Sequence, residues 1–94
     1  MIAENSWVAR TAAGLANIKR VQILERLAIG PCGNEELMAA LDGVPATTLQ
    51  FHMNRLSSAG LVMSQREGMK VEYWLCHGTV KLLIMSLEQM FGRD

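Results

Sequence analysis

Apolar residues recur at steps of three and four along most of the chain, which is the spacing of one face of a helix. The pattern predicts five helices, at about residues 2–16, 18–28, 34–41, 45–59 and 79–91. Before the last helix the period changes to two, which predicts two strands over residues 61–66 and 69–76, joined by a tight turn at Glu67-Gly68. The chain is therefore predicted to form four helices, a hairpin and a final helix.

Residues at the predicted helix ends support these boundaries. Asn17 is suited to cap the second helix, and Asn34 to cap the third, where two acids follow it in the first turn. Pro45 fits the first position of the fourth helix, which needs no backbone N–H, and Gly60 fits its end. In the second helix Arg20 lies off the apolar stripe, so it is predicted to face away from the core.

This order of elements is that of a helix-turn-helix that carries a β-hairpin wing. We therefore expect a mainly α fold with a small β-hairpin wing, a winged helix-turn-helix. Ninety-four residues are enough for one core and too few for two, so a single domain over residues 1–94 is expected.

The composition narrows the class of protein further. Half of the residues are hydrophobic and 19% are charged, a balance that excludes intrinsic disorder. No stretch approaches the roughly 18 apolar residues that cross a membrane, and residues 1–10 lack the layout of a signal peptide. We therefore expect a cytoplasmic protein with no membrane partner. The net charge is zero, so any polyanion partner would have to be held by a local basic surface.

Several motifs between Leu15 and Leu75 match the pattern of one known family. They are Leu15-Ala16-Asn17 with Arg20 and Ile23-Leu24, Glu36-Leu37, Thr48-Leu49-Gln50-Phe51-His52-Met53 with Leu56, Ala59-Gly60-Leu61-Val62, Arg66-Glu67-Gly68 and Tyr73-Trp74-Leu75. The set resembles the ArsR/SmtB-type winged-helix transcriptional repressors of bacteria and archaea. The resemblance implies a homodimer that binds a palindromic operator and releases it when an inducer binds. Pro45 and Gln50 replace serines usual in the family, so the resemblance does not indicate the operator sequence.

The residues of the fourth predicted helix point independently to DNA. Leu49, Met53 and Leu56 form one stripe, and a polar stripe lies opposite. Gln and Asn can pair with adenine in the major groove, Thr with either base edge, and Phe can contact the thymine methyl. Basic side chains on the helix and hairpin supply cations for phosphates. The predicted DNA-binding residues are Thr47, Thr48, Gln50, Phe51, Asn54, Arg55, Arg66 and Lys70.

The sequence also bears on three functions other than DNA binding: a protein-binding adaptor, an enzyme and a metal sensor. The same polar face would suit a winged-helix adaptor that binds only proteins, which is the alternative function. No catalytic constellation is present, so the protein is not expected to be an enzyme. His52 has no Cys or His at ligand spacing and is expected to pack or hydrogen-bond. Residues 35–41 lack the family's Cys-x-Cys metal site, and residues 79–91 offer only Glu88, so neither a metal nor another cofactor is expected.

A dimer is expected to form through the first and last helices. One core covers only one stripe of the last helix, which leaves Leu82 and Met85 on a second stripe. Trp7 and Val8 of the first helix also need a partner, and a two-fold copy of the same surfaces would supply it.

The two cysteines, Cys32 and Cys76, are candidates for a redox switch. Residues 31–33 are expected to pair as a third strand beside the second hairpin strand, near the end of that strand at Leu75 and Cys76. Two thiols brought within reach could form a conditional disulfide that releases DNA. The alternative is that both are small buried hydrophobes without a chemical role, and the inducer stays open.

Overall fold

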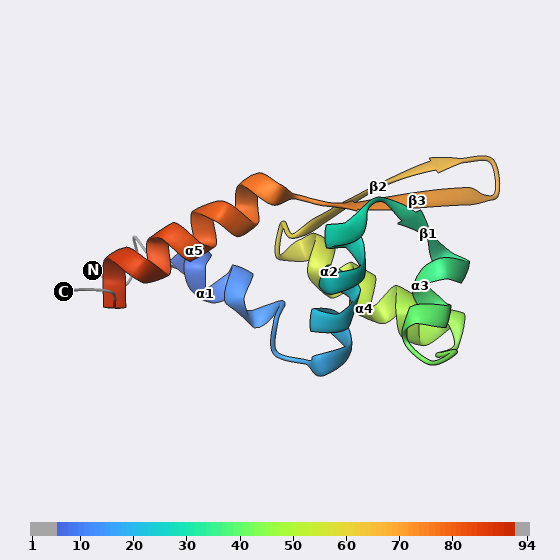
Figure 1. Ribbon diagram of the computed structural model, residues 1–94, viewed down its shortest axis with the longest axis horizontal. Helices are drawn as coiled ribbons and strands as arrows, with labels where there is room; N and C mark the ends of the chain where they lie inside the picture. Colours follow the sequence, from blue (N-terminus) through green and yellow to red (C-terminus); the bar gives the residue numbers. More distant parts are fainter. Residues whose placement is uncertain (1–5, 92–94) are drawn as a thin grey trace.

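Two parts make up the molecule, a body beneath a small sheet and a helical arm that projects from it (Figure 1). The computed structural model describes residues 6–91. The elements are α1 (Ser6–Ala13), α2 (Ile18–Ile29), β1 (Cys32–Gly33), α3 (Asn34–Ala40), α4 (Ala46–Ser58), β2 (Val62–Glu67), β3 (Lys70–Leu75) and α5 (His77–Phe91). Helices α2, α3 and α4 form the body with the sheet, while α1 and α5 contact each other in the arm. The predicted winged helix-turn-helix architecture is confirmed.

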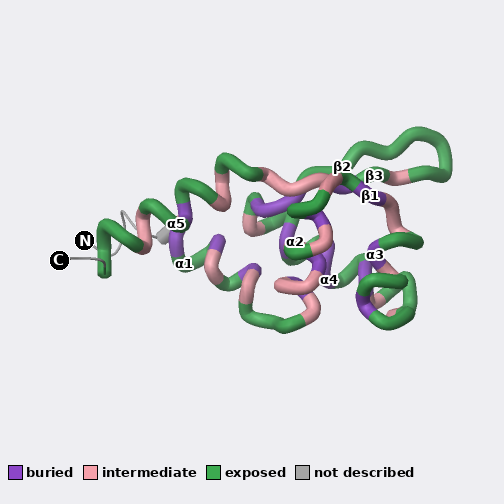
Figure 2. The backbone as a smooth tube through the Cα atoms, viewed as in Figure 1, coloured by how far each residue is buried: buried purple, intermediate pink, exposed green. Residues whose placement is uncertain are grey.

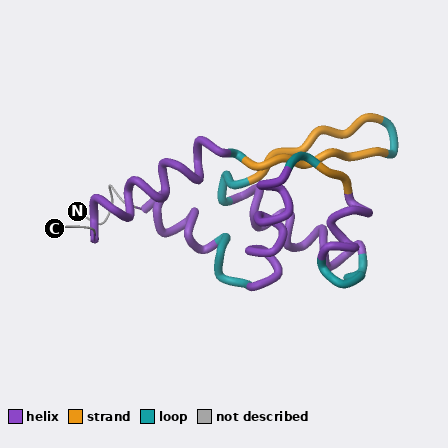
Figure 3. The backbone as a smooth tube through the Cα atoms, in the orientation of Figure 1, coloured by secondary structure: helices purple, strands orange, loops and turns teal. Residues whose placement is uncertain are grey.

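The sheet has three antiparallel strands in the order β1-β3-β2. Strands β2 and β3 pair from Val62 opposite Leu75 to Glu67 opposite Lys70, which leaves a two-residue turn. Its first residue is Gly68 at φ 64°, as the tight turn requires. The hairpin runs out past the helices as a wing (Figure 3). The short strand β1 confirms the predicted third strand next to β3.

The core lies where α2, α3 and α4 face the sheet, and the wing tip is exposed (Figure 2). Helices α2 and α4 supply five of its eleven residues, and the other six come from β1, α3 and its C-terminal end, the residue before β2, and the two strands of the hairpin. The cluster consists of Ile23, Leu27, Cys32, Leu37, Leu41, Leu49, Met53, Leu56, Leu61, Val62 and Tyr73.

Several helix ends differ from the prediction. Asn17 caps α2 as expected, and its side chain accepts a hydrogen bond from the backbone N–H of Lys19 at 2.8 Å. The N-cap of α3 is Gly33, not Asn34, because Glu36 accepts from the Gly33 N–H at 3.0 Å and so closes the first turn one residue earlier. Pro45 is the N-cap of α4 and not its first residue.

The first and last helices also begin or end at other residues than predicted. Helix α1 ends at Ala13 and not at Ala16, since Gly14 and Leu15 make the tighter i to i−3 bonds that close a helix. Helix α5 begins at His77, two residues earlier than expected. The predicted start of the first helix at Ile2 lies outside the described residues.

Gly14, between α1 and α2, allows a close approach to the end of α4. A Cβ at this position would lie 2.9 Å from Ala59 Cβ and 3.0 Å from Leu61 Cδ1. These separations are shorter than packed carbon atoms adopt, so only glycine lets the linker and the end of α4 meet here.

A polar pair lies inside the body, between α2 and α4. Arg20 is buried, which corrects the expectation that it faces away from the core. Its Nε donates to the carbonyl oxygen of Gly14 at 2.8 Å, and its Nη1 lies 3.4 Å from Nδ1 of His52. Burial lowers the pKa of His52, and the positive charges of Arg20 and Lys19 lower it further.

Gly14→Ala should destabilise the protein. The added methyl has no room between Ala59 and Leu61, so we expect a loss of about 1–3 kcal/mol in the free energy of unfolding, measured by urea denaturation. The control is Gly78→Ala, where a Cβ meets open space in α5. That variant should be neutral or gain up to about 1 kcal/mol. Equal stability of the two variants would contradict the close approach.

The unfolding free energy should decrease as the pH falls below the usual histidine pKa of 6.5. Because the pKa of His52 is lowered in the folded state, the unfolded chain binds its proton first, and acid favours unfolding through that window. His52→Asn should flatten the decrease in urea titrations between about pH 7 and about pH 5. His77, the other histidine, is present in both proteins and cancels in the comparison. Parallel pH profiles would exclude this role of His52.

Candidate nucleic-acid interface

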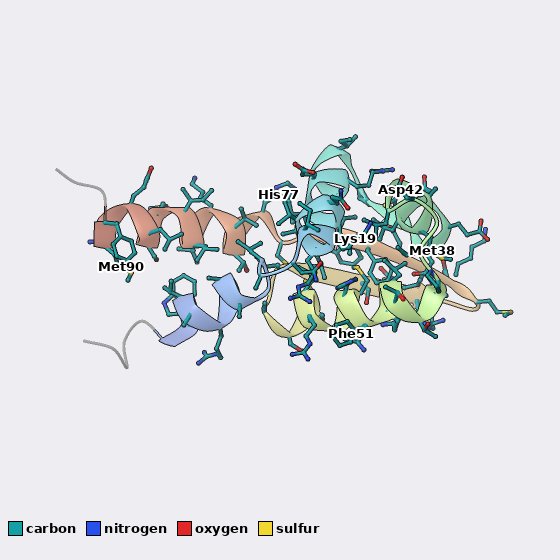
Figure 4. The ribbon with its side chains drawn as sticks, turned by 90° about the horizontal axis from the view of Figure 1, so that it is seen from below. Lys19, Met38, Asp42, Phe51, His77 and Met90 are labelled. Atoms are coloured by element: carbon teal, nitrogen blue, oxygen red, sulfur yellow. The ribbon has the colours of Figure 1, made fainter. Side chains whose placement is uncertain are left out.

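Helix α4 has one face in the core and one in solvent. Leu49, Met53 and Leu56 are at most 2% exposed, and they fix which side of the helix packs inward. Thr47, Gln50, Phe51 and Asn54 lie on the opposite face and are all exposed, while Thr48 is half-buried beside them. Figure 4 shows Phe51 pointing away from the body. The predicted polar stripe thus forms a continuous outer surface.

Two amides on this surface are already linked. Gln50 Nε2 donates to Asn54 Oδ1 at 2.8 Å, one helical turn away. The bond leaves the carbonyl oxygen of Gln50 and the amide hydrogens of Asn54 exposed next to each other. An acceptor and a donor side by side are what the major-groove edge of adenine requires.

The exposed ring of Phe51 is held by its neighbours on the helix. The Arg55 guanidinium carbon lies 5.0 Å from the ring centroid, which is within the range of a cation–π contact. The ring also meets the imidazole of His52 edge-on, with centroids 5.5 Å apart. Phe51 therefore stays outside the core, with Arg55 beside it on the surface.

The two basic residues of the hairpin lie on opposite faces of it. Arg66 pairs with Val71, on the face that carries the buried Val62 and Tyr73 and packs on the body. Arg66 accordingly lowers the pKa of Tyr73, although burial raises that pKa more strongly. Lys70 pairs with Glu67 on the other face. The structure thus brings Arg66, and not Lys70, to the side of the hairpin that packs on the body.

The cysteines are farther apart than expected. Strand β1 places Cys32 opposite Tyr73, three residues before Cys76, and not at the end of β3. Three strand residues span about 10 Å, while a disulfide needs Cα atoms within about 7 Å. Both thiols are free, and burial raises the pKa of each. The predicted proximity is wrong because Gly33 must also cap α3, which fixes the register of β1.

The arm exposes part of the predicted dimer surface. Leu82 and Met85 are 56% and 52% exposed, and Phe91 at the end of α5 is 77% exposed. Trp7 is half-buried. Val8 is only 5% exposed, so it is buried within its own chain, in the helix that packs on α5, and is not left for a partner.

Residues 6–91 contain neither a metal site nor a membrane-spanning helix. No three His, Cys, Asp or Glu residues of this part of the chain lie together where they could hold a metal ion. Over the same residues, no helix combines the length and the apolar character needed to cross a membrane.

Sequence reasoning missed the link between Arg20 and His52. The pattern along α2 assigns Arg20 to the polar side, since a cation there is normally solvated. One signal in the sequence could have indicated this link. His52 lies on the inner side of α4 and needs a polar partner there, and Arg20 supplies it while also bonding to the Gly14 carbonyl before α2.

Comparisons with known proteins agree with this geometry. Residues 17–64 match the family described as bacterial regulatory protein, arsR family. The HTH-type transcriptional regulator Rv0324 of Mycobacterium tuberculosis is 41% identical over 87 residues, which are 93% of this chain and 38% of that protein. The chain therefore spans well under half the length of this relative.

Solved structures share the fold over nearly the whole chain. The homodimeric winged helix-turn-helix DNA-binding domain of Mb0332 from Mycobacterium bovis, a possible ArsR-family regulator, is 31% identical with a TM-score of 0.76, over 98% of this chain and 92% of that one. HlyU from Vibrio cholerae is 27% identical with a TM-score of 0.78, over 97% and 98%. An ArsR-like regulator from Rhodococcus, 23% identical, supports the fold alone, with a TM-score of 0.84 over 96% and 82%.

The family match, the winged fold and the exposed polar face of α4 agree with the resemblance found in the motifs. The matched family and the relative from Mycobacterium tuberculosis are regulators of transcription. This chain belongs to the arsR family of bacterial transcriptional regulators and carries a winged-helix DNA-binding fold.

Proposed function

We propose that this chain is a repressor domain that binds a palindromic operator as a homodimer. The observation that carries the proposal is the solvent face of α4, where polar side chains and an exposed aromatic ring lie opposite a fully buried stripe. A helix of this kind can enter the major groove while its other face stays in the core. Repression follows where the operator overlaps a promoter.

In this proposal, α4 reads bases and its flanks hold phosphates. Gln50 and Asn54 pair with an adenine, and Thr47 and Thr48 bond to neighbouring base edges. Phe51 contacts a thymine methyl. Arg55 contacts the backbone from the helix, and Arg66 and Lys70 do so from the two faces of the hairpin.

The distribution of charge supports this orientation on DNA. Helix α4 carries Arg55 and no acid, while the acids Glu35 and Glu36 lie in the first turn of α3. The zero net charge therefore conceals a basic side at α4 and an acidic one at α3. A phosphate backbone fits the first side and is repelled by the second.

A homodimer through the arm would place two α4 helices on the same side of DNA. The exposed apolar residues Leu82, Met85 and Phe91 of α5 are the surface that a second copy would cover. The related domain from Mycobacterium bovis is described as homodimeric. Two-fold symmetry then matches a palindrome whose half-sites lie about one DNA turn apart.

Gln50→Ala and Arg55→Ala should weaken DNA binding in different ways. Gln50→Ala should cost about 1–3 kcal/mol at one base pair and relax selectivity there. Arg55→Ala should weaken binding to all sequences and reduce the slope of log affinity against log salt by about 0.9. Fluorescence anisotropy at several salt concentrations measures both effects.

Lys81→Ala is the control, since it removes an exposed cation from the arm and should leave the salt slope unchanged. Unaltered selectivity in Gln50→Ala would reject the placement of α4 in the groove. Absence of any salt-dependent DNA binding by the wild type would favour the adaptor function instead.

Leu82→Glu combined with Met85→Glu should convert the protein into a monomer. Two buried and unpaired carboxylates would oppose association of the arms. Sedimentation equilibrium at micromolar concentration should give a dimer mass for the wild type and the chain mass of 10.4 kDa for the variant. Met63→Glu is the control, because Met63 is 53% exposed on the hairpin, like Met85 on α5. A monomeric wild type would reject the dimer.

A further inference from the structure

A buried arginine joins the end of the arm to the DNA-reading helix. Arg20 lies on the first turn of α2 and is 9% exposed. Its Nε donates to the Gly14 carbonyl at the end of α1, and its Nη1 faces His52 in the middle of α4. One side chain thus contacts two elements that are 38 residues apart in the sequence, between Gly14 and His52.

The Arg20 guanidinium determines which nitrogen of His52 carries the proton. A guanidinium group has no acceptor, so the Nδ1 of His52 must accept and the proton must lie on Nε2. Burial and the charge of Arg20 lower the pKa of His52 and so favour the neutral imidazole that this arrangement requires. Neither partner of Arg20 is a carboxylate. A buried cation whose bonds are to a carbonyl and an imidazole is costly to leave unpaired, so separating Arg20 from either partner is unfavourable.

A second contact lies beside the first. Gly14 packs against Ala59 at the C-terminal end of α4, so closely that a Cβ added to Gly14 would lie 2.9 Å from the Cβ of Ala59. The end of the arm therefore meets α4 at its end through Gly14 and at its middle through Arg20 and His52. Two attachments along α4 fix the angle between α4 and the arm. A single attachment would leave α4 able to rotate relative to the arm.

His52 also lies directly beneath the reading surface. Its ring meets the ring of Phe51 edge-on with centroids 5.5 Å apart, and the Arg55 guanidinium carbon lies 5.0 Å from the centroid of the Phe51 ring. A change in the position of His52 is thereby transmitted to two side chains that face DNA.

We propose that Arg20 and His52 are positioning residues that fix the angle between the α1–α5 arm and α4, and thereby the half-site spacing that the dimer accepts. This inference rests on the proposed function, because it requires two copies joined through the arm. In such a dimer the arms define the two-fold axis, so the angle of each arm to α4 sets the separation of the two reading helices. Neither residue touches DNA in this role.

The test compares operators of different spacing. Duplexes are selected by the wild-type protein from a random-sequence library, and the best one is remade with one base pair inserted at its centre and with one removed. The affinity ratio between the selected and altered duplexes is the spacing discrimination. It is measured for the wild type and for His52→Leu, which keeps an apolar filler and removes the acceptor.

Two further variants separate positioning from stability. His52→Asn restores an acceptor near the position of Nδ1. Leu49→Val weakens the core on the same helix without touching Arg20, and costs about 0.5–1.5 kcal/mol of stability. Should His52→Leu not fold, Arg20→Met takes its place, because it removes the donors and keeps the length of the side chain.

We expect the spacing discrimination to fall about 2- to 30-fold in His52→Leu, the range of coupling that residues between two sites exert. Affinity for a single half-site should change less, His52→Asn should recover the discrimination, and Leu49→Val should retain it. Wild-type discrimination in His52→Leu or Arg20→Met overturns the inference and leaves the proposed function intact. Failure of the wild type to select any duplex overturns both.

Discussion

The burial of one stripe of α4 is the constraint on which the rest of the structure depends. Leu49, Met53 and Leu56 insert between α2, α3 and the sheet, and replacing any of them by Ala is expected to cost about 2–5 kcal/mol. That is a large part of the stability of a small domain. The same burial turns Gln50 and Asn54 outward, because they lie on the opposite face of the helix. Stability of the core and orientation of the reading surface therefore have one cause.

A second junction holds the hairpin to this body. Gly33 is both the last residue of β1 and the N-cap of α3, and its N–H is held by Glu36. Arg26 contacts the same carboxylate at 3.7 Å and donates to the Gly30 carbonyl, so α2 shares in the junction. Because β1 pairs with β3, these contacts set the position of the hairpin relative to the helices. The wing is thus oriented by α3, although most of its length is exposed.

Sequence periodicity was sufficient for the elements and for the two faces of α4, because each depends on neighbours within one or two turns of helix. It was insufficient where a position depends on contacts distant in sequence. The register of β1 follows from the cap of α3, and alternation in β3 does not encode it, so Cys32 was placed too near Cys76. The pattern along α2 predicts Arg20 in solvent, because the partners that bury it lie on other elements. The pattern along α1 likewise predicts Val8 at a dimer interface, whereas its own chain buries it.

The elongated shape, 46 Å by 25 Å by 22 Å, connects these features. An arm that extends beyond the body cannot be covered by it, so α5 keeps exposed residues such as Leu82, and among its described residues only Leu83 is buried. The arm meets the body through the short segment around Gly14, which touches both Arg20 and the end of α4, and through Val80 of α5, which packs against the core. The first of these attachments leads directly to the reading helix, because Arg20 contacts His52 in the middle of α4.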